Sequence, residues 1–309
     1  DGVLMDRVES GTQLARTMIQ IETQWEVPVL GSLEIPPLLR KELEQLIPGD
    51  RPSAELCHAL GDNFLRTGET ERVVEIASRR PITWKPPGLF TREKPLAGVV
   101  VALAYDDSMN CYFPDTLDLL ELCGATIVDF SPLRDGAPPE ADIIYLGCGH
   151  PERYAAQLSG NECMRLAIRN HVRKGGRIYA EGGGAAYLCQ HIETPTGMHR
   201  MVGILPAVAR SLQQHAPPRA VEFTLTEPCR LGNVGDTIRG YLDARWRLEP
   251  VGALHGCASE AIPPYSLVKS CRTIGSWVQL DFAAQPHLLS QFFHNAENAS
   301  DNADPWQIH

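Results

Sequence analysis

The sequence has no uninterrupted apolar run of about 18 residues, which is the length that a membrane-spanning helix needs. It also has no concentration of positive charge, because its 28 Lys and Arg residues are scattered and are outnumbered by 38 Asp and Glu residues. The net charge of −10 repels a phosphate backbone. We therefore expect the chain neither to cross a membrane nor to bind nucleic acid.

The nine cysteines include no Cys-x-x-Cys pair and no dense cluster, which are the usual signs of a zinc site or a disulfide framework. The first residues lack the basic segment and the long apolar segment of a signal peptide. We therefore expect reduced thiols, no metal site and a cytoplasmic location. The chain starts at Asp1 without Met and begins like a strand entered midway, so we expect further residues upstream.

The first 80 residues predict a β-α-β unit followed by helices. Residues 2–8 and 27–31 are short apolar runs that suit buried parallel strands, and residues 12–24 between them carry one apolar helical face. Two further helices are predicted over residues 38–47 and 53–66.

Proline marks a boundary between two domains. Residues 81–95 contain Pro81, Pro86, Pro87 and Pro95, which is a composition typical of a linker. We therefore place one domain over residues 1–80, a linker over 81–95 and a second domain over 96–295. The polar residues 296–309 are predicted to form a disordered tail.

The second domain alternates strand and helix patterns, which predicts a mostly parallel sheet with helices on both faces. Ligands of such sheets bind beyond the carboxyl ends of strands, so the loops after Ala104, Leu146 and Ala180 are expected to meet at a site. After Pro206 the pattern indicates antiparallel strands. The predicted elements are strands over 99–104, 126–130, 143–146, 177–180, 220–226, 238–246 and 277–282, and helices over 113–123 and 162–174.

Three glycines, Gly182 to Gly184, join the strand at residues 177–180 to a following helix. A sharp strand-to-helix turn of this kind presents the nucleophile in several enzyme classes, and glycine tolerates the backbone angles that it demands. No nucleophilic side chain stands in this turn. An ordinary glycine-rich turn between a strand and a helix explains the segment equally well.

The segment resembles the elbow Tyr-Ala-Glu-Cys-Gly-Gly-x-x-Tyr-Leu of the cobyrinic acid a,c-diamide synthase and CobB/CobQ-like glutamine amidotransferase family. It matches at Tyr179, Ala180, Glu181, Gly183, Gly184, Tyr187 and Leu188, and Gly182 replaces the cysteine. Further similar segments follow in the family's order along the chain. These are the opening strand with Asp106, Asn110 and Tyr112, residues 130–135 (Phe-Ser-Pro-Leu-Arg-Asp), residues 145–152 (Tyr-Leu-Gly-Cys-Gly-His-Pro-Glu) and residues 201–206. Residues 145–152 resemble the family's Tyr-Leu-Gly-Gly-Gly-Tyr-Pro-Glu, in which glycine stands at the position of Cys148.

The resemblance implies an α/β fold: a flavodoxin-like class I glutamine amidotransferase domain, preceded by the C-terminal part of a P-loop, dethiobiotin-synthetase-like domain. It also implies the amidation of carboxylates on a corrinoid or another tetrapyrrole, with ATP forming an acyl phosphate and glutamine supplying ammonia. No Gly-x-x-x-x-Gly-Lys-Ser/Thr motif occurs in the sequence. We therefore expect no cofactor within this chain, and ATP with Mg²⁺ only if a P-loop lies upstream.

The resemblance places the nucleophile at Gly182 and the histidine base on the last strand, at Gln279 or Asp281, so both catalytic functions are substituted. It places Tyr241 and Ala244 at two further histidine positions. We therefore expect an inactive glutaminase site. The resemblance assigns substrate contacts to Asn110, Tyr112, Gly147, Gly149, Glu181 and Gly183.

Two alternatives stay open. Cys148 and His150 could act as a surrogate nucleophile and base, or Cys148 could simply be a small buried side chain. The protein could remain a ligase that uses ammonia from solution or from a partner. It could instead be a non-catalytic pseudo-amidotransferase that binds a tetrapyrrole or a partner subunit, and we carry a homodimer as a further hypothesis.

Overall fold

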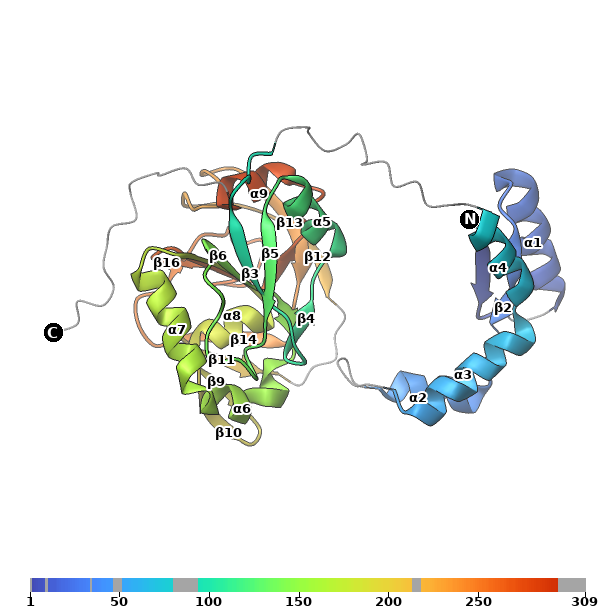
Figure 1. Ribbon diagram of the computed structural model, residues 1–309, viewed down its shortest axis with the longest axis horizontal. Coiled ribbons are helices and arrows are strands. Elements are labelled where there is room, and N and C mark those ends of the chain that lie inside the picture. The colour runs from blue at the N-terminus through green and yellow to red at the C-terminus, as the bar shows by residue number, and fades with distance from the viewer. Residues whose placement is uncertain are drawn as a thin grey trace. The chain divides into compact units, whose positions relative to one another are not determined.

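A computed structural model describes residues 2–8, 11–33, 35–46, 52–79, 94–212 and 218–293 (Figure 1). The chain divides into two compact units, Asp1–Pro87 and Gly88–His309. Most of the expected linker and the whole expected tail lie outside the described residues. The domain boundaries drawn from the sequence therefore stay a prediction.

The first unit contains the predicted β-α-β arrangement. β1 (Val3–Asp6) and β2 (Val29–Leu33) pair in parallel, and α1 (Gly11–Trp25) connects them. The following helices are α2 (Pro37–Gln45), α3 (Ala54–Thr67) and α4 (Thr70–Arg79). Ser53 caps α3 by accepting a hydrogen bond of 3.1 Å from the Leu56 N–H.

The second unit is built on a seven-stranded sheet in the order β15-β16-β17-β8-β6-β3-β5. Its strands β5, β3, β6, β8 and β17 are mutually parallel and follow the flavodoxin-like order 2-1-3-4-5. β6 and β8 are buried at every residue, which explains the unbroken apolar sequence of β6 and the apolar centre of β8. The strands of this sheet are β3 (Val100–Ala104), β5 (Thr126–Phe130), β6 (Ile143–Leu146), β8 (Arg177–Glu181), β15 (His255–Gly256), β16 (Leu267–Ser270) and β17 (Thr273–Ser276).

Helices and a 3₁₀ turn connect the parallel strands, as Figure 1 shows for α5, α6, α7 and α8. The predicted helices over 113–123 and 162–174 are confirmed within a residue or two at each end. The elements are α5 (Pro114–Leu122), η1 (Pro151–Tyr154), α6 (Ala155–Gly160), α7 (Glu162–Arg173), α8 (Gly183–Leu188) and α9 (Pro286–Phe293). None of the described helices is long and apolar enough to cross a membrane.

Three smaller sheets complete the unit. The antiparallel pattern expected after Pro206 is confirmed for β11 with β14 and for β13 with both β12 and β18. The other strand pairs are β9 with β10, β9 with β11, and β4 with β7. The bounds are β4 (Met109–Cys111), β7 (Cys148–Gly149), β9 (Cys189–Thr194), β10 (Gly197–Arg200), β11 (Leu205–Ser211), β12 (Arg219–Thr224), β13 (Thr237–Leu242), β14 (Trp246–Pro250) and β18 (Val278–Leu280).

One sequence expectation is wrong in detail. The strand predicted over 238–246 is two strands, β13 and β14, because β13 pairs with β12 and β18 whereas β14 pairs with β11. Apolar periodicity identifies a strand but not its partner, and the pairing decides where the strand stops.

Candidate functional site

The loops after β3, β6 and β8 meet beyond the carboxyl ends of these strands, as the sequence predicted. The Tyr112 hydroxyl donates to the Ala104 carbonyl and accepts a hydrogen bond of 2.9 Å from the Gly147 N–H, so it joins the first two loops. β4 and β7 pair across the same two loops. The Gly184 N–H donates to the Gly147 carbonyl at 3.1 Å and attaches the third loop.

Gly182 forms a sharp turn between β8 and α8. Its φ of +49° and ψ of −114° lie in a region that glycine adopts without the clash of a Cβ atom. The turn is fixed on both sides, because the Gly182 N–H donates to the Ser276 carbonyl at 2.7 Å and its carbonyl accepts from the Ala186 N–H at 3.0 Å. The geometry is that of a nucleophile elbow, and the position that carries the nucleophile has no side chain.

The space above Gly182 is occupied. A Cβ atom built there would lie 2.8 Å from the Cys148 sulfur and 3.4 Å from Oδ2 of Asp243. Burial raises the pKa of the Cys148 thiol well above its usual value, and the negative charges of Glu181 and Asp243 raise it further. Cys148 therefore keeps its proton at neutral pH, and the geometry favours a small buried side chain over a surrogate nucleophile.

An ion-pair network borders the same space. Arg245 contacts both carboxylate oxygens of Asp243, with Nη2 to Oδ2 at 2.6 Å and Nε to Oδ1 at 2.9 Å. It also donates to the Gly149 carbonyl at 3.1 Å and lies 2.6 Å from Nδ1 of His150. His150 contacts Glu152 at 3.0 Å, and Glu152 lies 3.7 Å from Arg245. The network thus joins the β13–β14 corner to β7 and η1.

This network was not anticipated from the sequence. At residues 240–245 the sequence shows the absence of histidine at Tyr241 and Ala244 and predicts no role for Asp243 or Arg245. The available signal was an acid and a base two residues apart. A sequence pattern does not place these segments side by side, whereas the fold does.

The predicted glycine contacts are positions of close packing. A Cβ atom would lie 2.3 Å from the Tyr112 ring at Gly147, 2.2 Å from the Ser108 carbonyl oxygen at Gly149 and 2.5 Å from Pro151 at Gly183. Any side chain at these positions would displace backbone or ring atoms. Asn110, predicted as a substrate contact, lies exposed in β4, and its Oδ1 lies 3.3 Å from the Cys111 sulfur.

Glu181 lies in the core of the second unit. It is 0% exposed, and its carboxylate accepts hydrogen bonds from Tyr145 Oη at 2.9 Å, Tyr179 Oη at 2.6 Å and the Leu280 N–H at 2.8 Å. Burial raises its pKa from 4.5 to about 7, against these three hydrogen bonds, which lower it. Glu181 therefore connects β8 to β18, and protein atoms enclose its carboxylate.

The two positions expected for the base carry side chains with local structural contacts. Gln279 donates from Nε2 to the Cys111 carbonyl at 3.3 Å, and Asp281 accepts from the Ala284 N–H at 3.1 Å, which caps the turn before α9. Asp106 likewise caps its own turn, because Oδ1 accepts from the Ser108 N–H at 2.8 Å. Within the described residues, no group of three His, Cys, Asp or Glu side chains is arranged to hold a metal ion.

Residues 100–241 match the family described as CobB/CobQ-like glutamine amidotransferase domain. The cobyrinate a,c-diamide synthase of Salmonella typhimurium LT2 is 30% identical over 318 residues, which cover 94% of this chain and 66% of that protein. The enzyme of the same name from Listeria monocytogenes serotype 4b is 33% identical over 250 residues, covering 78% and 54%. A crystal structure of a glutamine amidotransferase is 15% identical with a TM-score of 0.46, covering 63% of this chain and 99% of that one.

The chain thus spans between about half and two thirds of the length of these curated relatives. The elbow, the converging loops and the parallel strand order lie in the segment that the family match covers or directly beside it. Through this domain, the chain belongs to the CobB/CobQ-like family of glutamine amidotransferases.

Proposed function

We propose that this chain is part of a cobyrinate a,c-diamide synthase-like protein whose amidotransferase domain does not hydrolyse glutamine. The observation that carries the proposal is the elbow at Gly182. It has the backbone geometry of a nucleophile position, no side chain, and the sulfur of Cys148 at 2.8 Å from the place of the missing Cβ.

The chemistry supports this assignment. Attack on a carboxamide requires a thiolate and a nearby base that moves the proton to the leaving ammonia. Cys148 is held as a neutral thiol, and Gln279 and Asp281 stand where a base is expected. When groups act as one catalytic unit, loss of the nucleophile alone costs several orders of magnitude in rate, and further losses add little.

In the amidation reaction, ATP would convert a corrinoid carboxylate to an acyl phosphate, and ammonia would displace phosphate to form the amide. We propose that ammonia comes from solution or from a partner, and that the present domain supports the part of the protein that binds ATP and corrinoid. The similarity to cobyrinate a,c-diamide synthases supports this reaction class.

A non-catalytic pseudo-amidotransferase is the second candidate. The observation that favours it is the network of Asp243, Arg245, His150 and Glu152, which satisfies the charges of these side chains within the protein. A network whose charges are paired internally suits a domain that binds a tetrapyrrole or a partner subunit without turnover. We also keep a cytoplasmic location, supported by nine free cysteines, and a homodimer as proposals.

Glutaminase activity is tested directly by incubating the purified chain with glutamine, with and without ATP, and measuring glutamate. We expect no release above that of the buffer, while the Salmonella relative, run in parallel, serves as the positive control. Release that Cys148→Ala abolishes would overturn the proposal. A glutamyl thioester detected on the chain by mass spectrometry would overturn it as well.

A second assay separates the two candidate functions. The protein is incubated with cobyrinic acid, ATP and Mg²⁺, with either ammonium chloride or glutamine, and products are identified by mass spectrometry. A ligase with an inactive glutaminase forms diamide from ammonium only. A pseudo-amidotransferase forms no product from either nitrogen source, although the corrinoid spectrum changes on binding.

A further inference from the structure

A cleft of about 810 Å³ lies at the opposite end of the central sheet from the elbow. It is located at the amino ends of the adjacent strands β6, β8 and β17, where Arg177 begins β8 and Asp142 and Arg272 directly precede β6 and β17. Arg177, in the cleft, and Glu181, near the elbow, stand at opposite ends of β8. They are four residues apart, or roughly 13 Å along the strand. Its volume falls in the range of about 300–1,000 Å³ that is typical of small-molecule sites.

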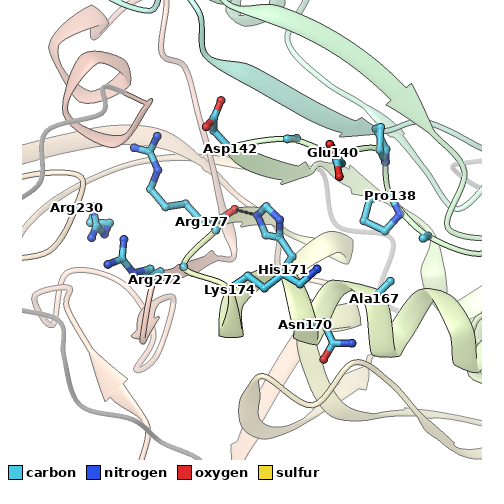
Figure 2. Close-up of a pocket in the computed structure, with 15 residues that line it drawn as sticks. Pro138, Glu140, Asp142, Ala167, Asn170, His171, Lys174, Arg177, Arg230 and Arg272 are labelled. Carbon is cyan, nitrogen blue, oxygen red and sulfur yellow. Dashed lines mark hydrogen bonds between the residues drawn. The ribbon is translucent and has the colours of Figure 1, made fainter.

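One wall of the cleft is cationic. Arg177, Arg230 and Arg272 gather on one side of the view in Figure 2, and Lys174 extends across its floor from the end of α7. These four residues come from separate segments of the chain, and the tertiary fold brings them together. Against four cations, the acids that line the cleft are Glu140 and Asp142.

Two of the four cations have no acidic partner within the part of the chain that the structure describes. These are Lys174 and Arg272, which make no ion pair there. Asp142 uses Oδ2 to accept the Val100 N–H at 2.8 Å, and Arg177 donates to the carbonyls of Phe292 and Phe293. Burial, followed by the charge of Arg230, lowers the pKa of Arg177 to about 10.

The opposite wall is less cationic. Pro138, Pro139 and Ala167, whose side chains offer no hydrogen-bond donor, lie there with Glu140 and Asn170. His171 lies between the walls with Nε2 at 3.0 Å from the Arg177 carbonyl oxygen, and burial lowers its pKa, so it remains neutral at pH 7. The positively charged hydrogen-bond donors that line the cleft are therefore the guanidinium groups of the three arginines and the ammonium group of Lys174.

We propose that this cleft binds a small, multiply charged oxyanion, with Arg272 and Lys174 as the side chains that contact it. Guanidinium groups match the paired oxygens of phosphoryl and carboxylate groups, and an anion would relieve the repulsion among the three arginines. The four cations come from separate segments of the chain. A ligand with two or more charged groups can therefore contact more of them than a single small ion can. This site is distinct from the elbow at Gly182, and the proposal does not depend on the proposed function.

Isothermal titration calorimetry of the 309-residue chain at low ionic strength tests the proposal, with pyrophosphate and citrate as separate probes. We expect at least one of them to bind. Binding of pyrophosphate alone identifies a phosphoryl ligand, and binding of citrate alone identifies a polycarboxylate. Arg272→Gln and Lys174→Gln should each weaken binding by about tenfold, because each removes a charge-assisted contact. Added sodium chloride should weaken binding as well.

Arg200→Gln is the matched control, because it removes the same charge from an exposed position in β10, outside the cleft. It should leave the affinity unchanged. Arg272→Lys keeps the charge and should retain part of the affinity, and circular dichroism verifies that each variant is folded. Lys174 is exposed at the end of α7, so Lys174→Gln carries the test even if Arg272→Gln unfolds. Absence of binding by either probe at millimolar concentration, or equal affinity in Lys174→Gln and Arg200→Gln, would overturn the proposal.

Discussion

Glu181, a residue that matches the family's elbow motif, has a structural role in this protein. Its carboxylate is fully buried next to Tyr145 and Tyr179, whose hydroxyls it binds together with the Leu280 N–H. A buried carboxylate with three donors tolerates its charge better than an unpaired one, yet burial still dominates its pKa. Position 181 therefore makes the stability of the domain depend on pH.

We predict that the free energy of unfolding falls as pH rises from 4.5 to about 7, by roughly 3 kcal/mol from this residue. Native Glu181 keeps its proton up to the higher pH, whereas the unfolded chain releases it at the lower one. The contribution of Glu181 to the free energy of unfolding is thus fully present below pH 4.5 and is lost as the pH rises past about 7. Glu181→Gln removes this dependence.

Urea denaturation across this pH range measures the effect. Glu222→Gln, an exposed glutamate paired with Arg239, serves as the control and should keep the slope of the wild type. If Glu181→Gln showed the same pH slope as the wild type, burial of a protonated Glu181 would be refuted.

At the scale of elements, the turn between β8 and α8 depends on what packs against it. Gly182 adopts a positive φ, and the Cys148 sulfur from β7 fills the space above it. Two substitutions relative to the family pattern, at positions 148 and 182, therefore fit each other. A cysteine at position 182 would enter the space that the Cys148 sulfur occupies.

We predict that Gly182→Cys lowers the free energy of unfolding by about 2–5 kcal/mol, from backbone strain and overlap with Cys148 together. Adding Cys148→Gly removes the overlap and should recover about 1–2 kcal/mol, which urea denaturation resolves. Gly203→Cys is the control for strain alone, because Gly203 has a φ of +80° and no atom near its Cβ position. A Gly182→Cys variant no less stable than Gly203→Cys would show that Cys148 does not block the elbow.

At the scale of the whole molecule, the two units differ in how much core they contain. The main hydrophobic cluster runs from Leu96 to Phe293 and lies entirely in the second unit. In the first unit, the buried apolar residues among those described are Val29, Leu30 and Leu56, around a two-stranded sheet. A two-stranded sheet with so small a core has marginal stability by itself.

We predict that residues 94–309 alone unfold cooperatively, with a midpoint within about 3 °C of the same transition in the full chain. Residues 1–79 alone should show no cooperative transition. Thermal denaturation followed by circular dichroism compares the three proteins. Loss of the cooperative transition from residues 94–309 would show that the first unit contributes to the core of the second.

Most elements of the fold were predictable because local patterns specify them. Fully apolar runs such as residues 143–146 indicated buried parallel strands, and the alternation with helices indicated the layered sheet. The strand break at Asp243 was not predictable, since it depends on β13 and β14 having partners in different sheets. The ion pair of Asp243 with Arg245 and its contacts with β7 and η1 follow from that break.

The sequence by itself determined the chemistry that is available: which positions carry a thiol, a base or no side chain at all, and in which order the strands and helices follow. Only the tertiary structure decided what surrounds each of them. It placed a sulfur over the bare elbow, enclosed Glu181 among tyrosines and brought four cations to one cleft. Burial and charge pairing depend on contacts between segments that are far apart in the chain. A sequence pattern shows only which residues are neighbours along the chain.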